Sequence, residues 1–305
     1  MNQLRKPLNI TIGIIVALGA IIASASGFYI DWLWFRSVDF TEVWSTILIT
    51  KIVLFVIVGV MTSLFITANI YIAYRKRPLY VPLSIEADNL ERYRAQLEPI
   101  RKWVLLGIAA VLIYFGGTSG SVFWSTWLQF RNSTPFGVTD PQFGLDVSFF
   151  AFKLPMYQAL IGWGISLTVI STLAAVGVHY LYGGIRPQAQ SERTTTAARI
   201  QISVLLGFFV LLKAVAYWYD RYALALKENA LITGMTFSDV NALLPAKAIL
   251  AAIAVVCAIL FFASIFTRSW LLPTAGTALL VISSVLIAGI YPAAIQQFTV
   301  KPSES

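Results

Sequence analysis

Long apolar stretches recur along the chain, separated by shorter polar segments, and their lengths indicate helices that cross a lipid bilayer. A bilayer hydrocarbon core of about 30 Å needs about 20 apolar residues in a helix. Seven stretches meet or approach that length, and none contains an aspartate or glutamate. Each is apolar around its whole circumference, as a lipid-surrounded helix is. The predicted spans are residues 8–30, 46–74, 103–119, 155–182, 200–219, 246–266 and 269–291.

Prolines and one short turn mark the expected ends of several spans. Pro155 and Pro245 lie where helices begin, and Pro292 lies just after one ends, as proline geometry favours. The segment Phe266-Thr267-Arg268-Ser269 predicts a tight turn between the last two spans. The predicted fold is therefore an all-α polytopic transmembrane helix bundle. We expect residues 1–292 to form its seven-span domain and residues 293–305 to lie beyond the last span, where the family resemblance given below implies the truncated start of an extracytoplasmic region.

The first apolar stretch has two interpretations. Arg5 and Lys6, an apolar run and then Ala23-Ser24-Ala25 would suit a cleaved secretory signal. The apolar run continues through residues 27–30, however, which favours an uncleaved span. Small residues also share one face of this helix, a pattern suited to close helix packing. They are Gly13, Ala17, Ala20, Ser24 and Gly27.

Lysine and arginine predict the orientation, because cytoplasmic flanks of membrane spans carry an excess of both. With the N-terminus inside, the cytoplasmic segments hold thirteen basic and five acidic residues, and the outer segments hold nine of each. The formal charge of +8 thus lies entirely on one face. Seven spans then place the C-terminus outside. Within the cytoplasmic loop between spans two and three, Ser84 is expected to cap a short helix whose apolar side includes Leu90 and Leu97.

Composition supports a membrane protein and removes several other classes. Hydrophobic residues make up 58% of the chain and charged residues 12%, against about 45–50% and about 25% in soluble domains. The basic excess is an orientation signal, so we expect no nucleic-acid partner. The expected partners are the bilayer of a bacterial cell membrane and other membrane proteins or further copies of the chain. One cysteine and one histidine leave no intrachain disulfide or histidine-rich metal site, and no cofactor is expected.

The segments outside the spans carry distinctive motifs. The first is Asn132-Ser133-Thr134-Pro135-Phe136-Gly137-Val138-Thr139-Asp140-Pro141-Gln142-Phe143, which continues through Asp146-Val147-Ser148-Phe149-Phe150 to Leu154-Pro155. The second comprises Asp220-Arg221-Tyr222, Phe237-Ser238-Asp239-Val240-Asn241-Ala242 and Leu244-Pro245, and the third is Phe298-Thr299-Val300-Lys301-Pro302-Ser303-Glu304. Together they resemble uncharacterised protein family 0182, a family of bacterial membrane proteins. The resemblance covers nearly the whole chain and implies seven spans followed by a long extracytoplasmic region. It transfers no activity and no catalytic residue.

Three lysines are the candidate ligand-binding residues. Lys51, Lys213 and Lys247 each lie within about two helical turns of an expected outer helix end. A cluster of lysines there would receive an anionic lipid headgroup or solute. Alternatively, each side chain extends separately to the outer interface, which is the interpretation we favour.

Other polar residues have plainer interpretations. Asp140, Asp146, Asp220 and Asp239 lack the spacing of a calcium loop and suit turns and helix starts. His179 is expected at the inner interface, Asn69 is expected to hydrogen-bond across helices or to its own backbone, and Cys257 to pack as a small apolar residue. The glycine-rich segment 116–121 lacks the lysine of a phosphate loop, so close helix packing or a flexible helix exit explains it better.

Three functions remain open at this level. The preferred hypothesis is a non-catalytic anchor or scaffold for an extracytoplasmic domain, because no catalytic constellation is recognisable. A transporter or channel for a lipid or small anionic solute is the alternative, although no predicted span contains the carboxylate that ion coupling commonly uses. An intramembrane enzyme is least favoured, since no nucleophile–base pair or metal set is visible.

Overall fold

The described part of the protein consists of helices and the loops that connect them. The computed structural model describes residues 5–78, 85–189, 193–228, 233–267 and 271–300. No β-strand occurs in these ranges, and three isolated bridges join loop residues. The all-α prediction is therefore confirmed for this part of the chain.

Six helical segments of the described chain are long and apolar enough to cross a membrane, and each coincides with one of the seven predicted spans. They contain α2 (Thr41–Arg75), α4 (Arg101–Val122), α6 (Leu154–Leu181), α7 (Thr196–Ala223), α8 (Leu244–Ala263) and α9 (Leu271–Ser283). The first predicted span lies within α1 (Arg5–Ser37), a helix of 33 residues. Membrane crossing by α1 and the orientation of the termini stay predictions.

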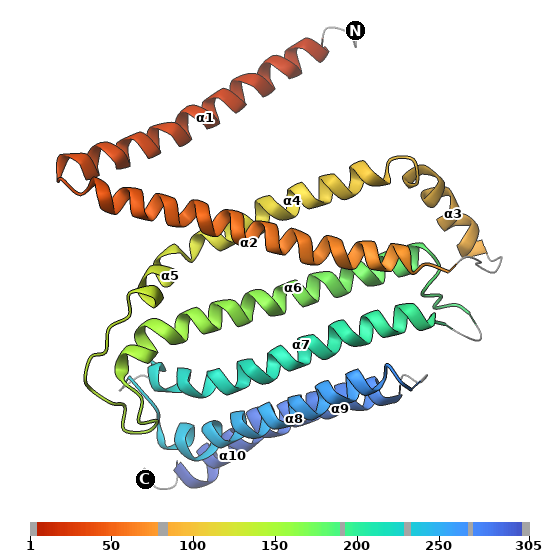
Figure 1. Ribbon diagram of the computed structural model, residues 1–305. Coiled ribbons are helices and arrows are strands. Elements are labelled where there is room, and N and C mark those ends of the chain that lie inside the picture. The colour runs from red at the N-terminus through yellow and green to blue at the C-terminus, as the bar shows by residue number, and fades with distance from the viewer. Residues whose placement is uncertain (1–4, 79–84, 190–192, 229–232, 268–270, 301–305) are drawn as a thin grey trace.

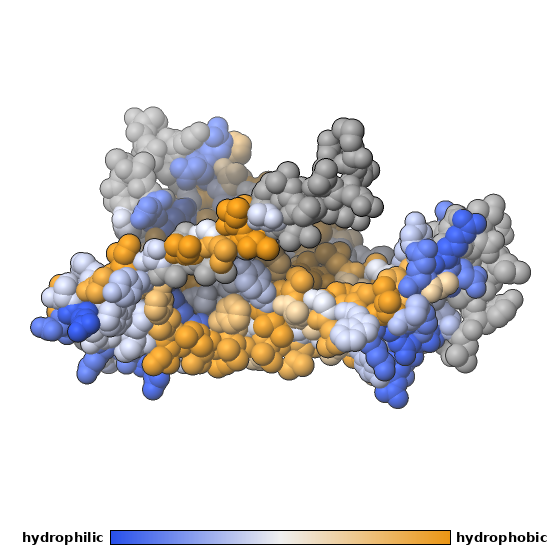
Figure 2. Space-filling view, turned by 90° about the horizontal axis from the view of Figure 1, so that it is seen from above, coloured by the Kyte–Doolittle hydropathy of each residue, from blue (hydrophilic) through white to orange (hydrophobic). Residues whose placement is uncertain are grey.

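The long helices lie side by side in a row, and each runs opposite to the long helix before it in the chain, so that α2 and α6 run in the same direction (Figure 1). Helix α2 packs against both α4 and α6, followed by the pairs α6–α7, α7–α8 and α8–α9. Helix α1 leans away from this row and joins it at the corner where the ring of Phe28 lies 4.9 Å from that of Trp44. Figure 2 shows a broad apolar band with hydrophilic residues gathered at both ends, the pattern expected of a protein crossing a bilayer.

Two shorter helices lie at opposite ends of the row (Figure 1). Helix α3 (Ile85–Leu97) confirms the short helix predicted in this loop, while its expected cap, Ser84, is outside the described residues; its cytoplasmic location stays a prediction. Helix α5 (Trp124–Arg131) was not predicted. We call the end with α5 and residues 132–148 the outer end and the end with α3 the inner end, following the predicted orientation. The predicted turn 266–269 lies partly outside the described residues.

Glycines allow α2 and α4 to cross closely. A Cβ atom at Gly59 would lie 2.6 Å from the carbonyl oxygen of Ile113, and one at Gly120 would lie 2.5 Å from the Cβ of Val58. Such distances are far below ordinary carbon contacts of about 3.5–4.0 Å. The close-packing interpretation of segment 116–121 is therefore confirmed, and α2 is the partner.

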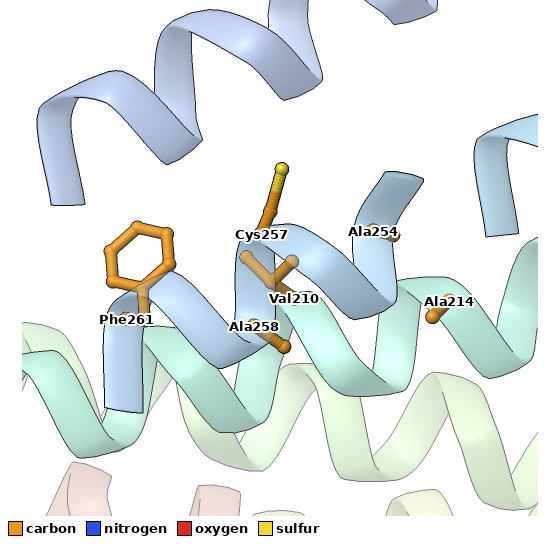
Figure 3. Close-up of a cluster of buried hydrophobic side chains, with 6 residues drawn as sticks. All are labelled: Val210, Ala214, Ala254, Cys257, Ala258 and Phe261. Carbon is orange, nitrogen blue, oxygen red and sulfur yellow. The ribbon is translucent and has the colours of Figure 1, made fainter. Parts of the chain in front are cut away.

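Small alanine side chains likewise lie where α7 and α8 pack together. Side chains from the two helices form a buried apolar cluster, drawn in Figure 3, with Cys257 fully buried. Its members are Val210, Ala214, Ala254, Cys257, Ala258 and Phe261. The interpretation of Cys257 as a small packed residue is confirmed.

A π-helical turn precedes each of three prolines, and it overturns one prediction. The residue before each proline donates its N–H to the carbonyl five positions back: Leu154 to Phe149, Leu244 to Asp239 and Tyr291 to Leu286. This wider turn relieves the clash that a proline ring makes with the preceding helical turn. Pro292 therefore does not follow a helix end. The helix continues through η4 (Ser284–Ile290), α10 (Tyr291–Ile295) and η5 (Gln296–Val300).

Candidate functional site

The three candidate lysines have different local partners. The ammonium of Lys247 lies 3.2 Å from Asp220 Oδ2. That of Lys213 lies 5.0 Å from the ring centre of Tyr217, one turn nearer the outer end, and that of Lys51 lies 5.3 Å from the ring centre of Trp124. These three contacts, all within the described residues, have no partner residue in common. Their role as a shared anion site remains a prediction.

The first motif folds into a loop organised by two aspartates. The carboxylate of Asp146 accepts hydrogen bonds from the backbone N–H groups of Phe136, Gly137 and Ser148, at 3.1, 2.9 and 2.8 Å. Asp140 Oδ2 accepts two more from residues 142 and 143. The Ser148 side chain and these N–H donors lower the pKa of Asp146 to about 2. The prediction that both aspartates cap turns is confirmed.

Aromatic rings fasten this loop to the ends of α6 and α7. The ring of Tyr222 lies 4.9 Å from Phe143 and 5.3 Å from Phe149, so the second motif packs directly on the first. Further ring contacts extend the group to neighbouring helices. This outer aromatic cluster comprises Phe130, Phe143, Phe149, Phe150, Tyr157, Tyr219 and Tyr222.

The rest of the second motif is held by a buried carboxylate. Asp239 is 1% exposed and accepts hydrogen bonds from Lys227 Nζ at 2.7 Å and from the backbone N–H and hydroxyl of Thr236. The prediction of a turn or helix start at Asp239 is confirmed. Next to it, the Ser238 hydroxyl donates to Gln296 Oε1 at 2.5 Å, two residues before the third motif begins. Segments distant in sequence thus meet in one layer at the outer end.

The sequence matches known proteins over almost the whole length of the chain. Residues 8–305 match the model of a family described as "Uncharacterised protein family (UPF0182)". The chain belongs to this family. A UPF0182 protein of Streptomyces coelicolor is 48% identical over 304 residues, which are 98% of this chain and 30% of that protein. Those of Nocardioides sp. and Thermobifida fusca are 45% and 43% identical, over 97% and 99% of this chain.

The UPF0182 chain spans about 30% of the length of these curated relatives, consistent with their N-terminal part. No solved structure matches it. The resemblance drawn from the motifs is confirmed. The structure adds that the first and second motifs, which are far apart along the UPF0182 chain, contact each other in space.

A second polar site lies inside the bundle, near the inner end. His179 Nε2 and Gln201 Oε1 are 3.0 Å apart, and Gln201 Nε2 donates to the backbone oxygen of Asn69 at 2.9 Å. The network joins α6, α7 and α2. His179 is 1% exposed and lies two residues before the end of α6, so the protein encloses the ring, with Gln201 as the partner of its Nε2. Its expected position at the inner interface stays a prediction. Asn69 also donates to Phe65 O, and its prediction is confirmed.

Sequence reasoning missed Gln201 and Tyr222 as contact residues. Gln201 is a polar residue in an otherwise apolar stretch, and that isolation was the available signal. Tyr222 was quoted as part of a motif, but a motif gives no information about which segment it packs against.

Proposed function

We propose that this chain is a non-catalytic membrane module, with seven spans in a bacterial plasma membrane and its N-terminus inside, that anchors an extracytoplasmic region. The observation that carries the proposal is the layer at the outer end, where the first two motifs pack on each other and the second contacts the last described helical segment. Tyr222 contacts Phe143 and Phe149, and Ser238 contacts Gln296.

This layer is suited to be a docking surface because contacts within the chain itself hold it in place. Aromatic pairs of this kind contribute about 0.5–1.5 kcal/mol each beyond the area they bury. The Asp146 hydrogen bonds hold the intervening loop, with Gly137 and Gly144 at φ +74° and +65°, where glycine is favoured. A surface ordered in advance loses little conformational entropy when a further domain packs on it.

The length of the relatives is the reason to expect a docking surface. The chain spans about 30% of their length, so a full-length member has a large additional region. The last described turn, Gln296–Val300, belongs to the same end as the layer. With the predicted orientation, that end faces the exterior. We therefore place the additional region of a full-length member against this layer.

Photocrosslinking in a full-length family member tests this placement. A photoreactive phenylalanine at the position of Val138, which is 62% exposed in the outer loop, is expected to crosslink to the extracytoplasmic region. The same probe at Tyr93 on α3, 61% exposed at the inner end, is the control and should not. Mapping both products by mass spectrometry decides the matter. Absence of the crosslink from position 138, or equal crosslinking from position 93, would refute the proposal.

A matched pair of substitutions separates the layer from a general effect. Tyr222→Ala removes the contact between the two motifs and is expected to reduce the crosslink from position 138. Phe40→Ala removes an exposed aromatic side chain at the same end, between α1 and α2 and outside the motifs, and should leave it unchanged. A transporter or channel for lipid is the second candidate function, and the groove described below is the observation that favours it.

A further inference from the structure

A groove opens on the outer half of the bundle beside α2. It has a volume of about 410 Å³ and is lined by α2, the end of α4, α5 and α6. The lining is apolar for most of its length and includes Ile57, Phe123 and Leu160. Arg131, the last residue of α5, is the charged residue of the lining. A cavity of this size falls within the range of about 300–1,000 Å³ that is usual for small-molecule sites.

The groove has the length of one bilayer leaflet. Along α2 its lining extends from Ile49 to Met61, which is about 18 Å at 1.5 Å per residue. Half of a hydrocarbon core is about 15 Å. At its deep end Trp163 on α6 donates a hydrogen bond to Thr62 Oγ1 on α2, at 3.1 Å. The lining along α6 ends at Trp163, so we expect an acyl chain that enters from the outer leaflet to end near this contact.

The positive charge at the opening of the groove favours a lipid with an anionic headgroup. Arg131 is exposed, and no carboxylate of the described residues forms a salt bridge with it. A guanidinium binds phosphate oxygens through two parallel N–H donors. Trp127, one turn earlier on α5, also lines the mouth, and tryptophan is enriched at the level of lipid headgroups. An apolar slot with an unpaired cation at its opening is complementary to a lipid with a net negative headgroup.

A groove in the inner half of the bundle can be compared with the outer groove. A second groove, of about 470 Å³, lies there between α2, α4 and α6, with Arg101 at its opening. Arg101 already forms a 2.6 Å ion pair with Glu98. The Tyr74 hydroxyl donates to Glu98 at 2.7 Å, and this hydrogen bond holds the pKa of Glu98 below its usual range. Arg101 is therefore engaged by the protein, with Lys102 as a second cation of the inner lining, whereas Arg131 of the outer groove has no carboxylate partner among the described residues.

We propose that the outer groove binds an anionic phospholipid of the outer leaflet, with one acyl chain along α2 and the phosphate on Arg131. The proposal is independent of the anchor function and needs only that α2, α4 and α6 cross the bilayer. The lipid would be a tightly held component of the fold, distinguishable from the annular lipids around it.

Native mass spectrometry of the protein, released from nanodiscs of phosphatidylglycerol and phosphatidylcholine in equal parts, tests the headgroup contact. The unmodified protein is expected to retain one phosphatidylglycerol in preference to phosphatidylcholine. Arg131→Gln removes a charge-assisted hydrogen-bond pair, so this preference should fall about tenfold. The matched control, Lys153→Gln, removes an exposed outer cation that does not line the groove. Equal retention of both lipids, or an equal loss in the control, would overturn the proposal.

A second variant tests the acyl slot. Ala159 lines the groove, and Ala159→Phe fills it; retention of either lipid should then be lost. Leu173→Phe adds a ring to a lipid-facing position of the same helix, 67% exposed and outside the groove, and should retain the lipid. Unchanged retention in Ala159→Phe overturns the proposal. An unaltered elution profile and melting temperature of Arg131→Gln show that its effect is not a loss of folding.

Discussion

Gly59 provides the most direct test of how the bundle is held together. A Cβ atom there would lie 2.6 Å from the carbonyl oxygen of Ile113 and 3.1 Å from the backbone nitrogen of Gly117. Ordinary carbon–oxygen contacts are about 3.3–3.6 Å, so in Gly59→Ala the two helices must separate by about 0.7 Å or more. The obstacle is backbone, which cannot rotate away as a side chain does.

The expected cost follows from this obstruction. Overpacking a tight interface costs about 1–3 kcal/mol. Gly59→Ala should therefore lower the free energy of unfolding by that amount, which shifts the unfolding equilibrium by about 5- to 150-fold. Titration of the purified protein in mild-detergent micelles with sodium dodecyl sulfate, followed by the fluorescence of its nine tryptophans, measures the change.

Gly107→Ala is the matched control, because Gly107 lies on α4 with no atom within 4 Å of the added carbon. Its free energy of unfolding should stay within about 0.5 kcal/mol of the unmodified protein. An equal loss in both variants would show that the glycines act through helix flexibility. No loss at Gly59 would show that α2 and α4 do not cross closely, and either result refutes the reasoning.

Two further predictions concern the polar contacts. Gln201→Leu breaks the link between His179 and Asn69. A hydrogen bond in a membrane protein contributes about 0.6–1.7 kcal/mol, so the free energy of unfolding should fall by about 1–3 kcal/mol in the same titration. No change would contradict the buried network. The pKa of Asp146 is lowered to about 2, so the ionised carboxylate should hold the outer loop from neutral pH down through mildly acid pH and release it only as the pH falls through about 2. Asp146→Asn should expose residues 136–148 to limited proteolysis at neutral pH, and unchanged cleavage would contradict this role.

The sequence was sufficient for the spans because their signal is local. Twenty apolar residues in succession have few alternatives to a membrane helix, and six of seven predicted spans are found. Close packing at segment 116–121 was also predictable, since glycines without a ligand-binding lysine suit a helix crossing. The helix end predicted before Pro292 was wrong, although proline usually ends a helix. A π-helical turn, which has no sequence signature of its own here, accommodates it instead.

Contacts between segments were beyond sequence reasoning for a different reason. Gln201 and Asn69 are 132 positions apart, and neither residue type specifies its partner. Tyr222 and Phe143 were both recognised as parts of motifs, yet their contact depends on how α6 and α7 bring the outer loop over the bundle. Arg131 was counted only as one outer charge. Its place at the opening of a groove follows from α5, a helix too short and polar to be predicted.

Helix α2 connects these findings, because it holds its two neighbours by different means at different heights. Near the outer half, Gly59 and the α4 glycines fix α4 against it. Near the inner end, Asn69 ties it through Gln201 to α7 and hence to His179 on α6. The walls of the outer groove are thus fixed on both sides, so the groove is a built feature of the bundle. Arg131 at its opening directly precedes the outer loop, residues 132–148. A lipid headgroup on Arg131 would therefore lie beside the proposed docking layer, and loss of the lipid should weaken the order of that loop.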